Sequence, residues 1–194
     1  MFTMKRLLLF ILLTAPFTLL AQTTPGNTLT PAEIYIWPNT IHQKLAEYEG
    51  EWDEEVTMWL SPKSQPETYK IKCINKMILG GRYLQSSQRG YMMGTEFEGL
   101  TTIGYHTNNQ KFTLTILNNI GTGTLTLLGF WITPFKSIEL FGDIPNAENT
   151  DVIHVRQVIN FIDKDNYVIQ NFDKRAGHEE YKNMEYRFTR KKKN

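Results

Sequence analysis

The sequence predicts an all-β protein: a closed, up-and-down barrel of about ten antiparallel strands, preceded by one short helix. After Gly50 the apolar residues recur at every second position, as in strands with one buried face. The alternating segments are rich in Thr, Val, Ile, Tyr and Phe, which favour strands. Short turn sequences at 107–110, 163–166 and 175–178 separate them and indicate hairpins. Consecutive hairpins favour a closed barrel over a sandwich.

Ten segments carry the alternating pattern. The candidate strands are residues 51–60, 69–77, 81–89, 96–105, 111–118, 123–131, 137–142, 152–161, 166–172 and 181–189. A single helix before the first of them has a natural place at one end of the barrel.

The short helix is expected just before Gly50. Thr40 and Gln43 have the spacing of a capping box, and Gly50 stands where a helix commonly ends. The positions expected on its apolar face are Ile41, Leu45 and Tyr48. A helix this short must be held by packing, because isolated short helices are marginal in water.

The first 21 residues have the pattern of a secretory signal peptide. Lys5 and Arg6 precede an apolar run from Leu7 to Leu13, and Ala21 suits cleavage before Gln22. Pro16 interrupts the run, which is short for a membrane span. We therefore expect a periplasmic or secreted protein with no stable membrane insertion once the leader is removed.

The rest of the chain divides into three parts. Residues 22–38 hold three prolines and are expected to form an irregular linker with an apolar knot at 34–37. Residues 39–191 form the barrel domain, and residues 192–194 form a basic tail.

Composition excludes some functions. Removal of the leader takes two of the 21 basic residues and none of the 20 acidic ones, which leaves a net charge of −1. Such a chain offers no nucleic-acid surface. Cys73 is the only cysteine, so no internal disulfide can form and stability must come from the core.

Several motifs resemble known barrels. A short helix followed by Gly-x-Trp at 50–52 and then only antiparallel strands is similar to the lipocalin and fatty-acid-binding superfamily. The segments M-I-L-G-G-R-Y-L at 77–84, M-M-G-T-E-F-E-G at 92–99, N-N-I-G-T-G at 118–123 and the closing M-E-Y-R-F-T-R-K resemble a bacterial family of lipocalin-like domains of unknown function, number fifteen seventy-nine in its series. The resemblance covers roughly residues 40–191, and an aspartate is expected where Asn118 stands. It implies a barrel end closed by Trp52 under the guanidinium of Arg190, a favourable cation–π contact. It implies no reaction.

The alternation assigns faces to the strands. If Trp52 points inward, Glu54, Val56, Met58 and Leu60 share its face, and Arg190 falls on the inner face of the last strand. The other positions expected inside are Tyr69, Ile71, Cys73, Asn75, Met77, Phe97, Thr101, Ile103, Tyr105, Phe112, Leu114, Ile116, Asn118, Gln157, Met184, Tyr186 and Phe188. For the third strand the alternation does not decide which face is inside, so Arg82 could point either inward or outward.

An apolar interior with a few polar groups is typical of small-molecule pockets. We therefore predict binding of a small, largely apolar molecule. The candidate ligand-binding residues are Trp52, Glu54, Tyr69, Asn75, Arg82, Tyr105, Asn118 and Tyr186. Two alternatives stay open. One is an isomerase- or hydrolase-like enzyme that uses Glu54 or a residue at the barrel mouth, although a buried carboxylate more often simply pairs with an inward arginine, for which Arg82 is the candidate. The other is a structural or interaction protein with a filled barrel and an exposed patch at 34–37 and Trp59.

No cofactor is expected. The alternation places His106 and His154 on outer faces, and no histidine has a partner at metal-ligand spacing, so neither a metal site nor a haem ligand is evident. The acidic run from Glu47 to Glu55 lacks the spacing of a calcium loop. No G-x-S-x-G motif is present for nucleophilic hydrolysis.

Overall fold

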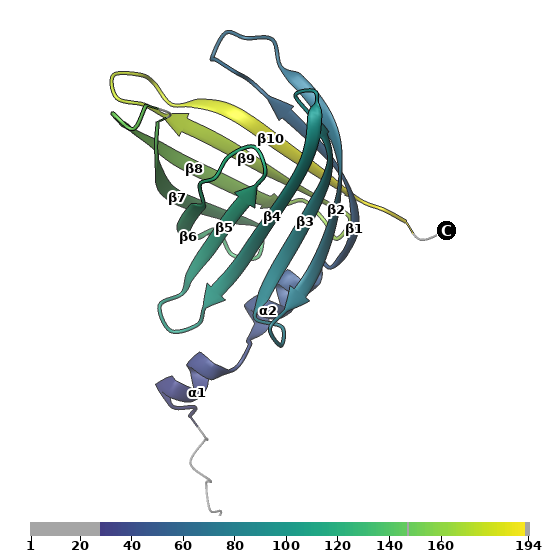
Figure 1. Cartoon of the computed structure of the whole chain (residues 1–194). Coiled ribbons are helices and arrows are strands. Elements are labelled where there is room, and N and C mark those ends of the chain that lie inside the picture. Colours follow the sequence, from purple (N-terminus) through teal and green to yellow (C-terminus); the bar gives the residue numbers. More distant parts are fainter. Residues whose placement is uncertain (1–27, 147, 193–194) are drawn as a thin grey trace, which may run out of the picture.

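A computed structural model describes residues 28–146 and 148–192 as a ten-stranded antiparallel barrel preceded by two short helices (Figure 1). The helices are α1 (Pro31–Ile36) and α2 (Thr40–Ala46). The strands are β1 (Gly50–Met58), β2 (Glu67–Ile78), β3 (Tyr83–Met92), β4 (Thr95–His106), β5 (Lys111–Asn118), β6 (Leu125–Thr133), β7 (Ser137–Pro145), β8 (Val152–Phe161), β9 (Asn166–Lys174) and β10 (Tyr181–Arg190).

The barrel is closed and follows the order of the chain. Each strand pairs with its sequence neighbours, and β1 pairs antiparallel with β10 to complete the ring. Both the predicted strand number and the predicted up-and-down topology are confirmed. The signal peptide assigned to 1–21, most of the linker before residue 28 and the end of the basic tail lie outside the described residues.

The alternation of exposed and buried residues sets the inner face as predicted. On β1, Trp52, Glu54, Val56 and Met58 are buried, whereas Glu51, Asp53 and Glu55 are exposed. Leu60 is 65% exposed, contrary to expectation, because β1 ends at Met58 and the chain leaves the wall there. The inner rows of the strands form one large apolar core and a smaller cluster of Val56, Ile71 and Met92.

The helical segment differs from the prediction in two respects. The expected irregular linker contains α1, whose N-cap Thr30 forms a capping box with Glu33. Pro31 suits this helix because the first helical position needs no backbone N–H. The N-cap of α2 is Asn39, with His42 completing the box, so the expected pair Thr40 and Gln43 was one residue out of register.

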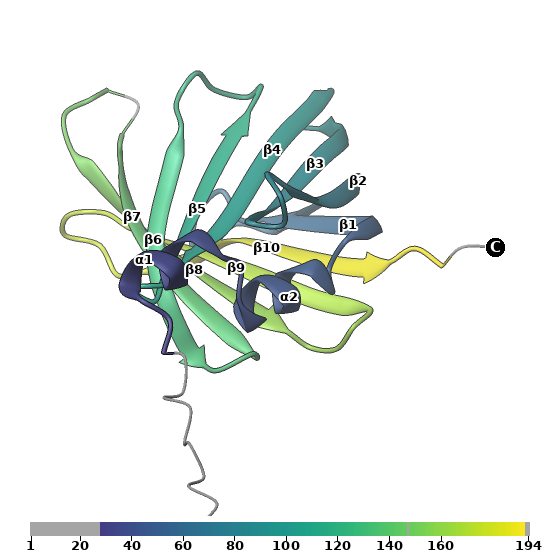
Figure 2. The ribbon, with the colours of Figure 1, turned by 90° about the horizontal axis from the view of Figure 1, so that it is seen from below.

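The short helix ends well before the glycine expected to terminate it. α2 stops at Ala46, and Gly50 is instead the first residue of β1. The face predicted for the helix is correct: Ile41, Leu45 and Tyr48 are all buried. Viewed from below, α2 lies across one end of the barrel with α1 beside it (Figure 2).

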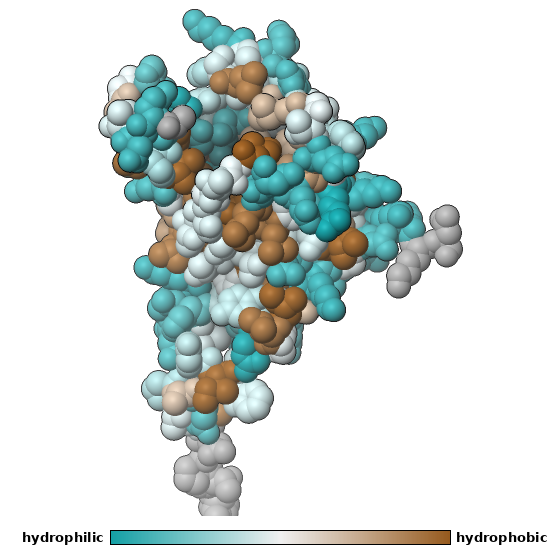
Figure 3. All heavy atoms as spheres, viewed as in Figure 1, coloured by the Kyte–Doolittle hydropathy of each residue, from teal (hydrophilic) through white to brown (hydrophobic). Residues whose placement is uncertain are grey.

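Within the described residues, no helix has the length and apolar character needed to cross a membrane. Hydrophobic atoms reach the surface over α1 (Figure 3), where Ile34, Tyr35, Ile36 and Trp37 are exposed. Trp59, the other member of the predicted apolar patch, is half-buried beneath the ammonium group of Lys182.

Candidate functional site

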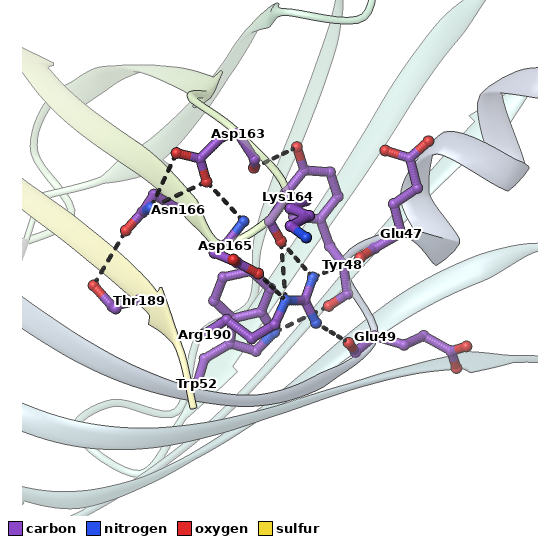
Figure 4. A network of polar contacts seen from close by, with 10 residues as sticks. All are labelled: Glu47, Tyr48, Glu49, Trp52, Asp163, Lys164, Asp165, Asn166, Thr189 and Arg190. Carbon is purple, nitrogen blue, oxygen red and sulfur yellow. Dashed lines mark hydrogen bonds and ion pairs between the residues drawn. The ribbon is translucent and has the colours of Figure 1, made fainter. Parts of the chain in front are cut away.

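One end of the barrel is sealed by the Trp52–Arg190 pair (Figure 4). The two residues are register partners on β1 and β10. The guanidinium carbon of Arg190 lies 4.2 Å from the centre of the Trp52 ring, and the indole Nε1 donates to the carbonyl of Tyr48 at 3.1 Å. The indole and the guanidinium thus stack on the inner face of neighbouring strands.

Arg190 also ties three chain segments together. Its guanidinium donates to the carbonyls of Glu47 and Glu49 at 2.6 Å and to that of Lys164 at 2.7 and 2.9 Å. Its Nε lies 3.1 Å from a carboxylate oxygen of Asp165. The α2–β1 connection, the β8–β9 turn and the end of β10 are thus held at one point.

The glycine of the Gly-x-Trp motif makes room for this contact. Gly50 has φ +123°, a conformation that residues with a Cβ rarely adopt. A Cβ there would lie 3.2 Å from a guanidinium nitrogen of Arg190. The motif therefore combines a sharp entry into β1 with space for the arginine.

A cavity of about 150 Å³ occupies the barrel above this seal. Leu45 and Tyr48 form its floor, so α2 and the residues after it act as a plug. The wall is mainly aliphatic and aromatic, with contributions from Val56, Leu114 and Ile159. An apolar cavity of this volume holds about one benzene-sized group, so a larger ligand has to extend through the open end of the barrel.

The cavity reaches solvent at the opposite end of the barrel. Leu117, Asn118 and Ile120 line it and are also exposed. They belong to the end of β5 and the loop toward β6, so this side of the rim provides the entrance.

Three polar side chains linked by hydrogen bonds lie in the cavity wall. The hydroxyl of Thr101 on β4 donates to Oε1 of Gln88 on β3 at 3.4 Å. The Nε2 of Gln88 in turn donates to both carboxylate oxygens of Glu54 on β1, at 2.8 and 3.0 Å. The first contact orients the amide so that its nitrogen faces Glu54.

Burial changes the titration of Glu54. Its side chain is 2% exposed, and desolvation raises its pKa from 4.5 to about 7, against a smaller lowering by the Gln88 hydrogen bond. The neighbouring Cys73, Tyr167 and Tyr186 have pKa values raised first by burial and then by nearby acidic groups, so they stay neutral when Glu54 ionises. Glu54 is thus poised to gain or lose a proton near neutral pH.

The predicted ligand-binding residues divide by position. Glu54, Asn118 and Tyr186 line the cavity. Trp52 lies beneath it in the closed end. Asn75 is buried in the core, where its Nδ2 donates to the Tyr167 hydroxyl and its Oδ1 accepts from Cys73.

Two further predicted residues, Tyr69 and Tyr105, also lie outside the cavity. Tyr69 packs against the small cluster of Val56, Ile71 and Met92, and its hydroxyl donates to Glu67. Tyr105 keeps its predicted inward parity but lies at the α2 end, edge-on to His42. A ligand-binding role for these residues stays a prediction.

Arg82 is not the partner of Glu54. It lies in the β2–β3 turn at the closed end, where its guanidinium donates to the carbonyls of Ile36, Leu79 and Gly80. The hydrogen-bond partner of Glu54 is Gln88 instead. Leu84, Ser86 and Gln88 form the inner row of β3, which places the Gln88 amide inside the barrel. Because the inner face of that strand could not be assigned from the sequence, neither Ser86 nor Gln88 was predicted to line the cavity.

The histidines predicted to face outward, His106 and His154, are both exposed. His154 lies 2.7 Å from Asp143 across the β7–β8 ladder. His42 is buried on α2, and burial lowers its pKa. Among the described residues, no group of three His, Cys, Asp or Glu side chains is placed to hold a metal ion.

The sequence matches the family described as "Protein of unknown function (DUF1579)" over residues 37–190. The chain belongs to the DUF1579 family. The match starts just before α2 and ends at Arg190, so this DUF1579 domain includes both the plug and the closing arginine.

A solved structure shares the fold. It is described as "Crystal Structure of Rv2717c from M. tuberculosis" and is 17% identical to this DUF1579 chain, with a TM-score of 0.58. The alignment covers 85% of this chain and 100% of that one. The likeness shows the fold alone. No curated protein matches the sequence.

Proposed function

We propose that this DUF1579 protein binds a small, largely apolar molecule inside its barrel. The observation that carries the proposal is the cavity of about 150 Å³, open beside Asn118 and lined mainly by apolar side chains around the Glu54–Gln88 pair. Apolar walls with a few oriented polar groups are the usual composition of ligand pockets.

A neutral fluorescent dye provides the test. N-phenyl-1-naphthylamine should bind with increased fluorescence, and native mass spectrometry of protein purified from its source should show a co-purifying small molecule. Ile116→Trp places a large ring on the inner face of β5 and should abolish dye binding. Thr115→Trp, on the outer face of the same strand, is the matched control. Equal dye binding by both variants would contradict an interior site.

We also propose that the protein is exported. The support is the leader pattern of residues 1–21, with cleavage after Ala21. Cell fractionation and mass determination of the mature N-terminus test this. A mature protein that retains Lys5 and Arg6 would contradict it.

A second candidate function is acid–base catalysis by Glu54. A buried carboxyl group with a pKa of about 7 in a cavity wall suits proton transfer at neutral pH. A bound molecule that is recovered after incubation in D2O should then carry solvent deuterium on carbon, and Glu54→Gln should prevent this exchange. Equal exchange in the variant would remove Glu54 from any such step.

A further inference from the structure

Among the described residues, the cavity lining carries a negative charge and no positive one. Of the described residues that line it, none is Lys, Arg or His, and Glu54 is its one carboxylate. The Gln88 amide, which is neutral, donates to both carboxylate oxygens, and no cationic side chain in the described lining offsets the charge when Glu54 ionises. A second negative charge brought into this small space would be repelled strongly, because buried charges are screened poorly.

A second polar position faces the cavity from β8. Gln157 is 2% exposed and lines the cavity, and its Oε1 has no hydrogen-bond partner. Its register partner on β9, Asn171, also has an unpaired carbonyl oxygen, while its Nδ2 donates to Asn183 and Asp173. Buried acceptors without partners are rare and costly in folded proteins.

A ligand in the cavity can supply the hydrogen-bond donor that the Gln157 oxygen lacks. The unpaired oxygen of Gln157 calls for a hydrogen-bond donor, and Glu54 disfavours any anion. The remaining wall, including Leu114 and Ile159, calls for apolar surface.

Resting on the proposed binding function, we infer that the ligand is an apolar molecule whose polar end is uncharged and donates a hydrogen bond, as an alcohol or a primary amide does. The same cavity rejects carboxylates of equal length. Gln157 accepts from the donor, and Glu54 supplies the discrimination against anions.

Three probes of similar size separate these effects: 1-octanol, heptyl methyl ether and octanoate. The ether has the heavy-atom count of the alcohol but no donor, and octanoate adds a negative charge. Each competes with N-phenyl-1-naphthylamine in a fluorescence titration at about pH 8, where the carboxyl groups of both octanoate and Glu54 are largely ionised.

The alcohol should bind about tenfold more tightly than the ether, the equivalent of one hydrogen bond. Octanoate should bind at least about tenfold more weakly than the alcohol, because at pH 8 the two charges repel each other unless Glu54 takes up a proton. Gln157→Leu should remove the advantage of the alcohol over the ether without changing the affinity of the ether. Glu54→Gln should selectively strengthen octanoate binding.

The outcomes separate this inference from the function on which it rests. If the dye binds and octanoate competes as well as 1-octanol, binding stands and the inference is wrong. If the alcohol keeps its advantage in Gln157→Leu, the donor site is elsewhere and the inference is also wrong. If neither the dye nor any probe binds, both proposals fall.

Discussion

Replacement of Glu54 by Gln should change how stability depends on pH. In the folded state the pKa of Glu54 is about 7, whereas the ordinary value is 4.5. The folded protein therefore holds this proton more tightly than the unfolded chain. Its contribution to stability is fully present below about pH 4.5 and is lost as the pH rises through 7.

The size of the effect follows from the shift. About 2.5 pKa units correspond to about 3 kcal/mol, at roughly 1.4 kcal/mol per unit. Glu54→Gln retains the side-chain shape and an oxygen that can accept from Gln88. Relative to the wild type, the variant should gain about 3 kcal/mol of unfolding free energy between about pH 4.5 and 8.

Urea unfolding followed by tryptophan fluorescence measures this difference at a series of pH values. Glu55→Gln is the control, because Glu55 is the next residue on β1 and is exposed on the outer face. Its stability should follow the wild-type pH profile. A stability difference between Glu54→Gln and the wild type that stays constant with pH would refute the reasoning.

Two further substitutions test the framework. Arg190→Met removes the cation–π contact and four hydrogen bonds to partly solvated carbonyls, and should cost about 3 kcal/mol in urea unfolding. Lys191→Ala breaks only an exposed ion pair and should cost under about 0.5 kcal/mol, so similar values for the two would argue against the closure. Gly129→Ala would place a Cβ 1.9 Å from the carbonyl oxygen of Glu139 and should lower Tm by about 5 °C or more, whereas Gly123→Ala meets nothing and should leave Tm within about 2 °C.

Much of the fold could be predicted because alternation is a local property of the sequence. Each strand carries its own inside and outside, and short turns force neighbours to pair. Trp52 and Arg190 could be placed on one inner face by parity alone, although 137 residues lie between them. Ten candidate strands joined by consecutive hairpins then indicated a closed barrel.

The site was less predictable. Whether an inward-facing residue lines the cavity also depends on its position along the barrel axis, which the alternation of a strand does not reveal. Tyr69 and Tyr105 have inward parity, yet one lies toward the rim and the other at the α2 end. Gln88 was missed because its strand mixes polar residues on both faces. The predicted cap of α2 was one residue too late because Asn39 and Thr40 are both acceptable N-caps, and in the structure Asn39 is the one whose side chain accepts from the N–H of Ile41.

The pairing of the first strand with the last has a consequence for biogenesis. While β10 is still absent, the growing sheet presents unpaired backbone along both β1 and β9, and open edges of this kind invite pairing with other chains. The ring closes only when the final ten-residue strand, Tyr181–Arg190, arrives. Loss of that strand by premature termination would therefore leave an open, aggregation-prone sheet in which the Trp52 indole lacks its Arg190 cover, and not a shorter barrel.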